Sequence, residues 1–366
     1  MPELPASLLA RLRAGGSGLT VLAIRLGAMG DVVRTLPAVR LVKGALPGAR
    51  IHWAVDERWG TLLSGHPDLA GILPLPRARW DRLARSVRGW PALVGELVRF
   101  RRAVREPGAG LVLDFHGNLR SGLVGLWSRA PVRLGFDGHQ QKEGNRRLTT
   151  HRVPSGERRV SRMERNLSLV RVLGIPDGPL PDAGLPETGA DVRAALETSG
   201  GVPYAVIWPG ASRRQAYKRV PAPLLAEAAR ACRAEGILPL VLHGPGEEED
   251  AAAVLAAAAG TARPGPVLDL RALAALLRRA VLYVGGDTGP LHLACGVGCP
   301  VVGVYGPTDP VVNAPWGVPH VVVSPPGRVY HGIPRLDRAG AGFDGIVPDD
   351  VTRAVVGLAR ERRARP

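Results

Sequence analysis

The chain of 366 residues is 45% apolar and 22% charged, a composition typical of globular proteins that excludes extensive disorder. Its length suits two domains, each able to bury a core of its own. No run of 18 apolar residues occurs, because Arg25 interrupts the best candidate, and the N-terminus has no signal-peptide pattern. We therefore expect a cytoplasmic protein without a membrane-spanning helix.

The formal net charge of +16 would suit contact with nucleic acid or with an anionic membrane surface. Arginine supplies nearly all of the bases, and its excess beside Ala, Gly and Pro is typical of a GC-rich coding bias, which raises charge without selection for binding. One amphipathic stretch nevertheless concentrates arginines, at Arg77, Arg79, Arg82, Arg85, Arg88, Arg99, Arg101, Arg102 and Arg105. A solvated helix face and a contact with anionic lipid both explain this stretch, since each base near such a surface contributes about 1 kcal/mol.

Strand patterns alternate with helical patterns along both halves of the chain. In the first half, strands are predicted at 19–24, 50–55, 71–75 and 110–115, and a helix over 31–46. In the second half, strands are predicted at 204–208, 238–243, 267–270, 281–285 and 301–305, and helices over 222–235 and 248–259. Two successive series of this kind predict an α/β protein with two doubly wound parallel sheets.

A stretch rich in Pro, Gly and Asp, residues 175–203, is predicted to link the two domains. A second irregular region, residues 325–345, precedes a helical pattern over 348–363. Ligands are expected in the cleft between the sheets, at the carboxyl ends of the strands. The predicted parts are a domain over 1–185, a domain over 186–345, and a terminal helix within 346–366 that can pack back on the N-terminal domain.

The stretch RLGAMGDVVRTLP, residues 25–37, places Asp31 where a strand and a glycine turn lead into a helix. Its GxxGD spacing differs from the dinucleotide-binding GxGxxG pattern. An Asp at the start of a helix often only caps it. The alternative is a carboxylate aimed into the cleft as a general base.

Two stretches in the second half follow predicted strands in the same way. WPGASRRQAYKRVP, residues 208–221, offers a small-residue loop with Ser212 and then Lys218, which suits a phosphate, although a surface lysine is the alternative. HGPGEEED, residues 243–250, places Glu247 nearest the strand end, where it can hydrogen-bond a ribose hydroxyl. The acids after Glu247 complement a helix dipole and are expected to be structural.

The stretch GGDTGPLH, residues 285–292, contains the Asp-Thr-Gly signature of aspartic proteases. Such an enzyme needs two of these carboxylates on an all-β scaffold, and this chain has one. Here a strand, a tight turn and a helix opening at Thr288 and Gly289 form a geometry that binds phosphate. His292 points the same way as Thr288, so we expect a ligand contact rather than a structural histidine. Asp287 either contacts the ligand or only braces the turn.

Several kinds of site are absent from the sequence. It has no P-loop GxxxxGK[ST], no Asp-x-Asp to hold a metal on a diphosphate, and no His or Cys cluster with zinc spacing. Cys232, Cys295 and Cys299 lie in apolar stretches and are expected to be small buried side chains. We therefore expect no metal and no cofactor, with the charge of a leaving group met by Lys218 and helix N-terminal amides.

Taken in order, five motifs resemble the ADP-heptose:lipopolysaccharide heptosyltransferase family, glycosyltransferase family 9. They are IRLGAMGDVVRTLPAVRLVKGALPGARIHWAVDE, LVLDFHGNLRSG with RLGFD, PGASRRQAYKRVP, GPGEEE, and GGDTGPLHLA with GPTDP. The resemblance implies a GT-B fold, in which an N-terminal Rossmann-like domain holds the acceptor and a C-terminal one holds the nucleotide sugar. It also implies inverting, metal-independent transfer of heptose from ADP-heptose to the inner core of a lipopolysaccharide precursor. The reaction would take place at the cytoplasmic face of the membrane.

The resemblance also implies roles for individual residues. Asp31 corresponds to the catalytic base that deprotonates the acceptor hydroxyl for attack on the anomeric carbon. Lys218 corresponds to the phosphate-binding lysine, and Glu247 to the acidic nucleotide contact. The other implied donor-binding residues are Ser212, Asp287, Thr288, Gly289 and His292. Arg120 and the segment 138–147 fall on the acceptor side.

Two other functions stay open at this point. A family 9 enzyme can use another nucleotide sugar or an acceptor other than lipopolysaccharide. A non-catalytic nucleic-acid-binding protein would account for the charge but would leave the cleft motifs unexplained. The partners we expect are therefore the nucleotide-sugar donor, the lipopolysaccharide-precursor acceptor and an anionic membrane surface, with no nucleic acid.

Overall fold

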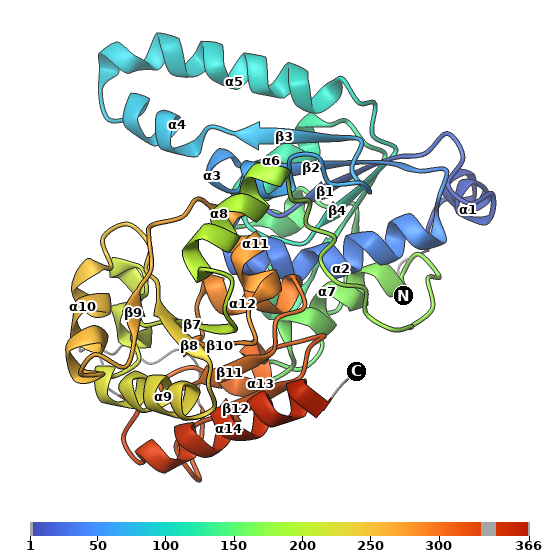
Figure 1. The fold of residues 1–366 in the computed structure, drawn as a ribbon. Coiled ribbons are helices and arrows are strands. Elements are labelled where there is room, and N and C mark those ends of the chain that lie inside the picture. The colour runs from blue at the N-terminus through green and yellow to red at the C-terminus, as the bar shows by residue number, and fades with distance from the viewer. Residues whose placement is uncertain (1–2, 331–341, 365–366) are drawn as a thin grey trace. The chain divides into compact units, whose positions relative to one another are not determined.

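A computed structural model describes residues 3–330 and 342–364 of the chain. The chain divides into two compact units, Met1–Pro186 and Glu187–Pro366. Each unit contains one six-stranded sheet flanked by helices (Figure 1). The strand pairs are parallel throughout both sheets, so the prediction of two doubly wound parallel sheets is confirmed.

The sheet of the first unit has the order β3-β2-β1-β4-β5-β6. Its strands are β1 Thr20–Ile24, β2 Arg50–Asp56, β3 Gly71–Leu75, β4 Leu111–Asp114, β5 Val132–Phe136 and β6 His151–Val153. Its helices are α1 Ala6–Arg13, α2 Met29–Ala45, α3 Glu57–Leu63, α4 Arg77–Leu83, η1 Val87–Gly89, α5 Trp90–Arg105, α6 Leu119–Trp127, η2 Gly138–Gln140, η3 Asn145–Arg147 and α7 Arg162–Arg171. The order reverses between β1 and β4, so the loops after these strands diverge and leave a crevice of the kind in which α/β proteins bind ligands.

The sheet of the second unit repeats this topology as β9-β8-β7-β10-β11-β12. Its strands are β7 Tyr204–Trp208, β8 Leu238–Val241, β9 Arg263–Pro264, β10 Leu282–Gly286, β11 Val301–Val304 and β12 His320–Val323. Its helices are α8 Gly189–Ser199, η4 Arg213–Lys218, α9 Ala222–Ala234, α10 Glu248–Ala257, α11 Leu270–Arg279, α12 Gly289–Gly296, α13 Pro310–Asn313 and α14 Pro348–Ala364. The order here reverses between β7 and β10, so a ligand is expected to bind after those two strands.

The central strands are almost entirely buried, as continuous apolar runs in parallel sheets are. Every residue of β7 and β10 is buried, and so are four of the five residues of β1. The helix predicted over 348–363 is present as α14, and its apolar face, including Val351, Val355 and Leu358, belongs to the core of the second unit. It packs there against α9 and β12. The expectation that this helix also packs back on the N-terminal domain stays a prediction.

One prediction of local structure was wrong. The residues 267–270 form no strand, because Asp269 accepts hydrogen bonds from the N–H groups of Arg271 and Ala272 and so starts α11. The predicted linker 175–203 includes the boundary between the two units and also contains α8, which Thr188 caps by accepting a hydrogen bond from the N–H of Asp191. Of the irregular region predicted over 325–345, residues 331–341 lie outside the described residues.

Two smaller predictions from composition can be compared with the structure. Cys232, Cys295 and Cys299 are buried and unbridged, as expected of small side chains in apolar stretches. Among the described residues, no helix is long and apolar enough to cross a membrane.

Candidate active site

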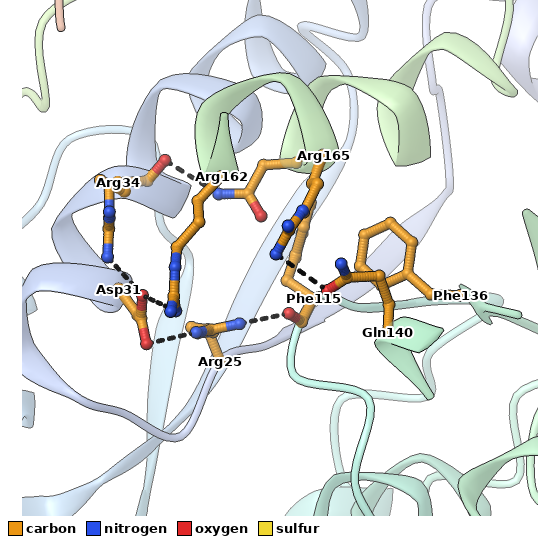
Figure 2. A pocket seen from close by; sticks show the side chains of 9 residues that line it. Arg25, Asp31, Arg34, Phe115, Phe136, Gln140, Arg162 and Arg165 are labelled. Carbon is orange, nitrogen blue, oxygen red and sulfur yellow. Dashed lines mark hydrogen bonds and ion pairs between the residues drawn. The ribbon is translucent and has the colours of Figure 1, made fainter. Parts of the chain in front are cut away.

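A small cavity lies in the first unit, beside the loops that follow β1 and β4. Its volume is about 40 Å³, and one carboxylate and four guanidinium groups line it (Figure 2). The lining residues are Arg25, Asp31, Arg34, Phe115, Phe136, Gln140, Arg162, Arg165 and Asn166. We call this cavity the arginine pocket. With four cations and one anion, it suits a negatively charged ligand group.

Arginines from three segments surround the carboxylate of Asp31. Arg25 follows β1 and places its Nη2 2.5 Å from Oδ2, while its Nη1 donates to the carbonyl oxygen of Phe115 at 2.5 Å. Arg34, one turn further along α2, places its Nη2 2.7 Å from Oδ1. Arg162 on α7 places its Nη1 3.2 Å from the same oxygen. Asp31 therefore joins α2, α7 and the end of β1.

The arginines control the ionisation of Asp31. Burial of the side chain, which is 16% exposed, favours the neutral form, but the charges of Arg25, Arg162 and Arg34 outweigh burial and hold the pKa of Asp31 well below its usual range. Asp31 is therefore ionised at neutral pH, the state in which a carboxylate can accept a proton. The same charges make it a weak base.

Arg165 completes the arginine pocket from α7 and donates to the side-chain oxygen of Gln140 at 3.3 Å. Burial, together with the charges of Arg162 and Arg34, lowers the pKa of Arg165 to about 10. Burial is the larger cause of this shift, and the crowding of like charges adds to it, which an anionic ligand would relieve.

The alternative that Asp31 only caps a helix is wrong. Helix α2 begins at Met29 with Ala28 as its N-cap, so Asp31 lies within the first turn. The sequence reasoning identified Asp31 but missed the arginines around it. For Arg34 a signal existed, because residues three apart on a helix lie side by side. For Arg162, which is 131 residues from Asp31, no local pattern was available.

The buried carboxylate of Asp114 joins the two segments that were predicted on the acceptor side. Its donors are the N–H groups of His116 and Gly117 at 3.0 Å, the Ser121 hydroxyl at 2.9 Å and the Asn145 side-chain amide at 2.8 Å. Burial raises the pKa of Asp114, against the effect of these hydrogen bonds. The structure thereby brings the loop before Arg120 into contact with the segment 138–147. Sequence reasoning had not singled out Asp114 or Asn145.

In the second unit, Asp287 follows β10 and uses both carboxylate oxygens within the unit. Lys218 donates from Nζ to Oδ2 at 3.0 Å and to the backbone carbonyl of Asp287 at 2.9 Å. The Nε2 atom of His292 lies 3.2 Å from Oδ1. Lys218, Asp287 and His292 therefore form one network. Because Asp287 is buried, this network is internal and braces the loop between β10 and α12.

Lys218 is not a solvated surface lysine, since its side chain is largely covered and paired with Asp287. An ammonium group has three N–H donors, and the contacts with Asp287 use two of them. The third is suited to a phosphate oxygen beside this loop.

The predicted strand, turn and helix after residue 280 are confirmed as β10 and α12. Thr288 is the N-cap of α12, but its side chain makes no capping hydrogen bond, and Pro290 in the first turn has no N–H. Gly289 and Leu291 therefore supply the early backbone donors of the helix. Uncapped N–H groups at a helix start favour an anion.

Glu247 lies at the end of the loop after β8 and folds over Gly210. Its Oε2 accepts hydrogen bonds from the Trp208 indole and from the N–H of Gly244, both at 3.1 Å. A Cβ on Gly210 would lie 2.2 Å from Oε2, so only glycine fits beneath this carboxylate. Burial raises the pKa of Glu247. Its other oxygen, Oε1, makes no hydrogen bond within the described part of the chain and is available to a hydroxyl group.

The remaining predicted positions are close to this loop. Ser212 is exposed at the N-cap of η4, and its hydroxyl caps nothing there. Two of the acids after Glu247 are structural, as expected: Glu248 accepts from the N–H of Gly246, and Asp250 pairs with Arg219 at 3.2 Å. No cluster of three or more His, Cys, Asp or Glu side chains that could hold a metal lies within residues 3–330 or 342–364.

The sequence matches a family model described as glycosyltransferase family 9 (heptosyltransferase) over residues 97–330, more than half of the chain. A similar protein is lipopolysaccharide heptosyltransferase 1 of Pseudomonas aeruginosa, which is 29% identical over 309 residues, or 82% of each chain.

Two solved structures are also similar. One is a family 9 glycosyl transferase from Veillonella parvula, with a TM-score of 0.76 and 20% identity over 94% of this chain and 98% of the other. The second is E. coli heptosyltransferase WaaC with ADP-2-deoxy-2-fluoro heptose, with a TM-score of 0.69 and 24% identity over 94% of this chain and all of the other. The fold is therefore GT-B. This chain belongs to glycosyltransferase family 9, the heptosyltransferases, and is a glycosyltransferase.

Proposed function

We propose that this enzyme transfers a heptose from ADP-heptose to the inner core of a lipopolysaccharide precursor, with inversion at the anomeric carbon and without a metal ion. The observation that carries the proposal is the ionised Asp31 inside the arginine pocket, which combines a proton acceptor with a site for an anionic acceptor. The donor and acceptor are supported by the similarity to lipopolysaccharide heptosyltransferase 1 and to WaaC, which was solved with an ADP-sugar analogue.

In the proposed reaction, Asp31 takes the proton from the acceptor hydroxyl. The hydroxyl oxygen attacks the anomeric carbon from the face opposite the diphosphate, and the bond from that carbon to the diphosphate oxygen breaks. ADP leaves with the bonding electrons, and its negative charge is met by the third N–H of Lys218 and by the start of α12. Glu247 holds the ribose through Oε1.

The arginines have a second role in this proposal. A carboxylate held by three guanidinium groups has little affinity for a proton. An anionic group on the acceptor competes with Asp31 for Arg25 and Arg162. The pKa of Asp31 then rises when the acceptor is bound, so the base gains strength at the moment of transfer.

We place the reaction at the cytoplasmic face of the membrane, with the enzyme bound peripherally. The proposed donor is a nucleotide sugar and the proposed acceptor is carried by a lipid. The two meet where the cytoplasm borders the membrane, and a protein with a net charge of +16 is attracted to anionic lipid there.

The test is ADP release from ADP-heptose with a delipidated inner-core acceptor, compared with a panel of other nucleotide sugars. ADP-heptose should be used at least tenfold faster than the others, the product should have the opposite anomeric configuration by NMR, and EDTA should not change the rate. Faster release from another nucleotide sugar, or turnover only with an acceptor unrelated to lipopolysaccharide, would assign the alternative function within the family.

A further inference from the structure

Helix α5 has two apolar faces, although a helix at the surface of a domain needs one. Its inner face, which includes Leu97, Phe100 and Val104, is turned towards the unit. On another face Trp90, Val94 and Val98 are 56%, 59% and 43% exposed. These three residues are spaced four apart, so they form a continuous line over the first turns of the helix. We call this line the exposed stripe.

The helix that carries the stripe packs against a second helix, α4. Figure 1 shows α4 and α5, in cyan, at the outer edge of the first unit's sheet, beside the edge strand β3. Trp80 of α4 packs edge-to-face on Phe100 of α5, with ring centroids 5.3 Å apart. Arg79 of α4 pairs with Glu96 of α5 at 2.9 Å. The stripe is therefore presented by two helices fastened to each other.

The charges around the stripe are almost all positive. Between residues 77 and 105 the chain carries nine arginines and two acids. Both acids are neutralised locally, since Asp81 pairs with Arg77, and Glu96 pairs with Arg79 and Arg99. Arg101 and Arg102, which are exposed, continue α5 beyond Val98. The apolar line thus ends in a basic segment.

We propose that the exposed stripe and the arginines around it dock the enzyme on an anionic lipid surface, with Trp90, Val94 and Val98 entering the interface between headgroups and acyl chains. An apolar line with Trp on a helix rich in Arg is the composition of helices that lie in a membrane interface. A second copy of the chain fits less well, because a symmetric contact would set arginines against arginines. The proposal rests on the proposed function only in naming the lipid-borne acceptor as the reason to dock.

The test measures binding of the full chain to vesicles in the absence of substrate. Vesicles of phosphatidylglycerol mixed with phosphatidylcholine are compared with phosphatidylcholine alone. The wild type should bind the anionic vesicles at least tenfold more tightly than the neutral ones, and binding should weaken as salt increases.

Two triple variants locate the docking surface. Trp90→Gln/Val94→Gln/Val98→Gln keeps good helix formers on α5 and should weaken binding to anionic vesicles at least tenfold. The matched control Leu196→Gln/Val202→Gln/Val267→Gln removes three similarly exposed apolar side chains from the second unit and should bind as the wild type does. Both variants should keep the wild-type rate of ADP release with a water-soluble acceptor, so a failure of docking is distinguishable from a failure of the proposed reaction.

Brominated lipids measure the depth of insertion, because they quench tryptophan fluorescence within the membrane. Most of the quenching should be lost in Trp90→Phe, which keeps an aromatic ring at this position. The proposal is overturned if the wild type does not bind anionic vesicles, or if the stripe variant binds them as well as the control does. It is also overturned if the stripe variant dissolves a dimer of the wild type without changing vesicle binding, since the stripe would then belong to a second copy.

Discussion

The two units have the same strand order, but their candidate sites differ in charge. One site has an excess of positive charge, and in the other the charged side chains are paired. Each unit has a candidate site where the strand order reverses, after β1 and β4 in the first unit and after β7 and β10 in the second. The first unit gathers four arginines around Asp31 and keeps an excess of positive charge. The second unit closes Lys218, Asp287 and His292 into one network. The topology thus positions a site, and the residues on the loops decide its chemistry.

This difference in charge predicts how the candidate site of each unit responds to a bound ligand. Like charges crowd the arginine pocket, so an anion that enters stabilises it and changes the pKa of Asp31. Lys218 is already paired with Asp287. A phosphate would therefore bind the remaining N–H donor of Lys218 and leave this ion pair almost unchanged. Four experiments follow from this contrast.

Replacing Asp31, the proposed base, should have the largest effect. Asp31→Asn keeps the shape of the side chain but cannot take a proton, so kcat should fall by about 10² to 10⁴. The affinity for ADP, measured by calorimetry, should stay unchanged because the residues proposed to bind the donor are intact. The control is Asp68→Asn, which also removes a carboxylate paired with an arginine, Arg40, and should keep its activity. A wild-type kcat in Asp31→Asn would remove Asp31 from the mechanism.

Removing Lys218 from its network with Asp287 and His292 should have the next largest effect. Lys218→Ala removes the cationic lysine from the buried Asp287 carboxylate, which should lower the free energy of unfolding by about 3 to 5 kcal/mol. It should also weaken ADP binding at least tenfold. In Lys218→Ala/Asp287→Ala the stability should recover while the ADP affinity stays low. Recovery of ADP affinity in this double variant would show that the lysine acts only as a structural partner.

Replacing the glycine beneath Glu247 should perturb the proposed donor site less than Lys218→Ala does. Gly210→Ala puts a Cβ where the carboxylate lies and should displace it, weakening ADP binding roughly tenfold through the loss of one charged hydrogen bond to the ribose. The wild type should discriminate ADP from an analogue without the ribose hydroxyls, and the variant should not. Gly189→Ala, where a Cβ meets only an ordinary contact, is the control. Undiminished discrimination in Gly210→Ala would exclude a ribose contact by Glu247.

The smallest expected effect is a shift in the pH dependence of kcat/KM. In the wild type the arginines lower the pKa of Asp31, so the acid limb of kcat/KM, which reports the free enzyme, lies below the usual range of a carboxylate. Arg162→Ala removes one of the charges that lower this pKa, so the limb should move to higher pH. Arg171→Ala, which alters the same helix but removes pairs with Glu164 and Asp177, should leave the limb in place. An unchanged limb in Arg162→Ala would show that Arg162 does not control the base.

Much of the fold could be predicted because the central strands are continuous apolar runs. The strands β1, β2, β7 and β10 were recognised within two residues of their ends. The strand β5 contains an arginine and β6 is three residues long, so neither has a clear apolar pattern, and both were missed. At 267–270 the apolar residues predicted a strand. The strand does not form, because Asp269 caps the start of α11 with its side chain. Local polar bonds of this kind compete with hydrophobic patterning and are harder to see in a sequence.

By itself, the sequence determined the two sheets, the family and the chemical groups at the ends of the strands, among them Asp31, Lys218 and Glu247. Only the tertiary structure decided that Arg162 lies against Asp31 across 131 residues of chain, and that Lys218 pairs with Asp287 across 69. The reason is physical. Periodicity and turn chemistry act between neighbours in the chain, whereas the strength of a base depends on charges within a few ångströms, whichever part of the chain supplies them.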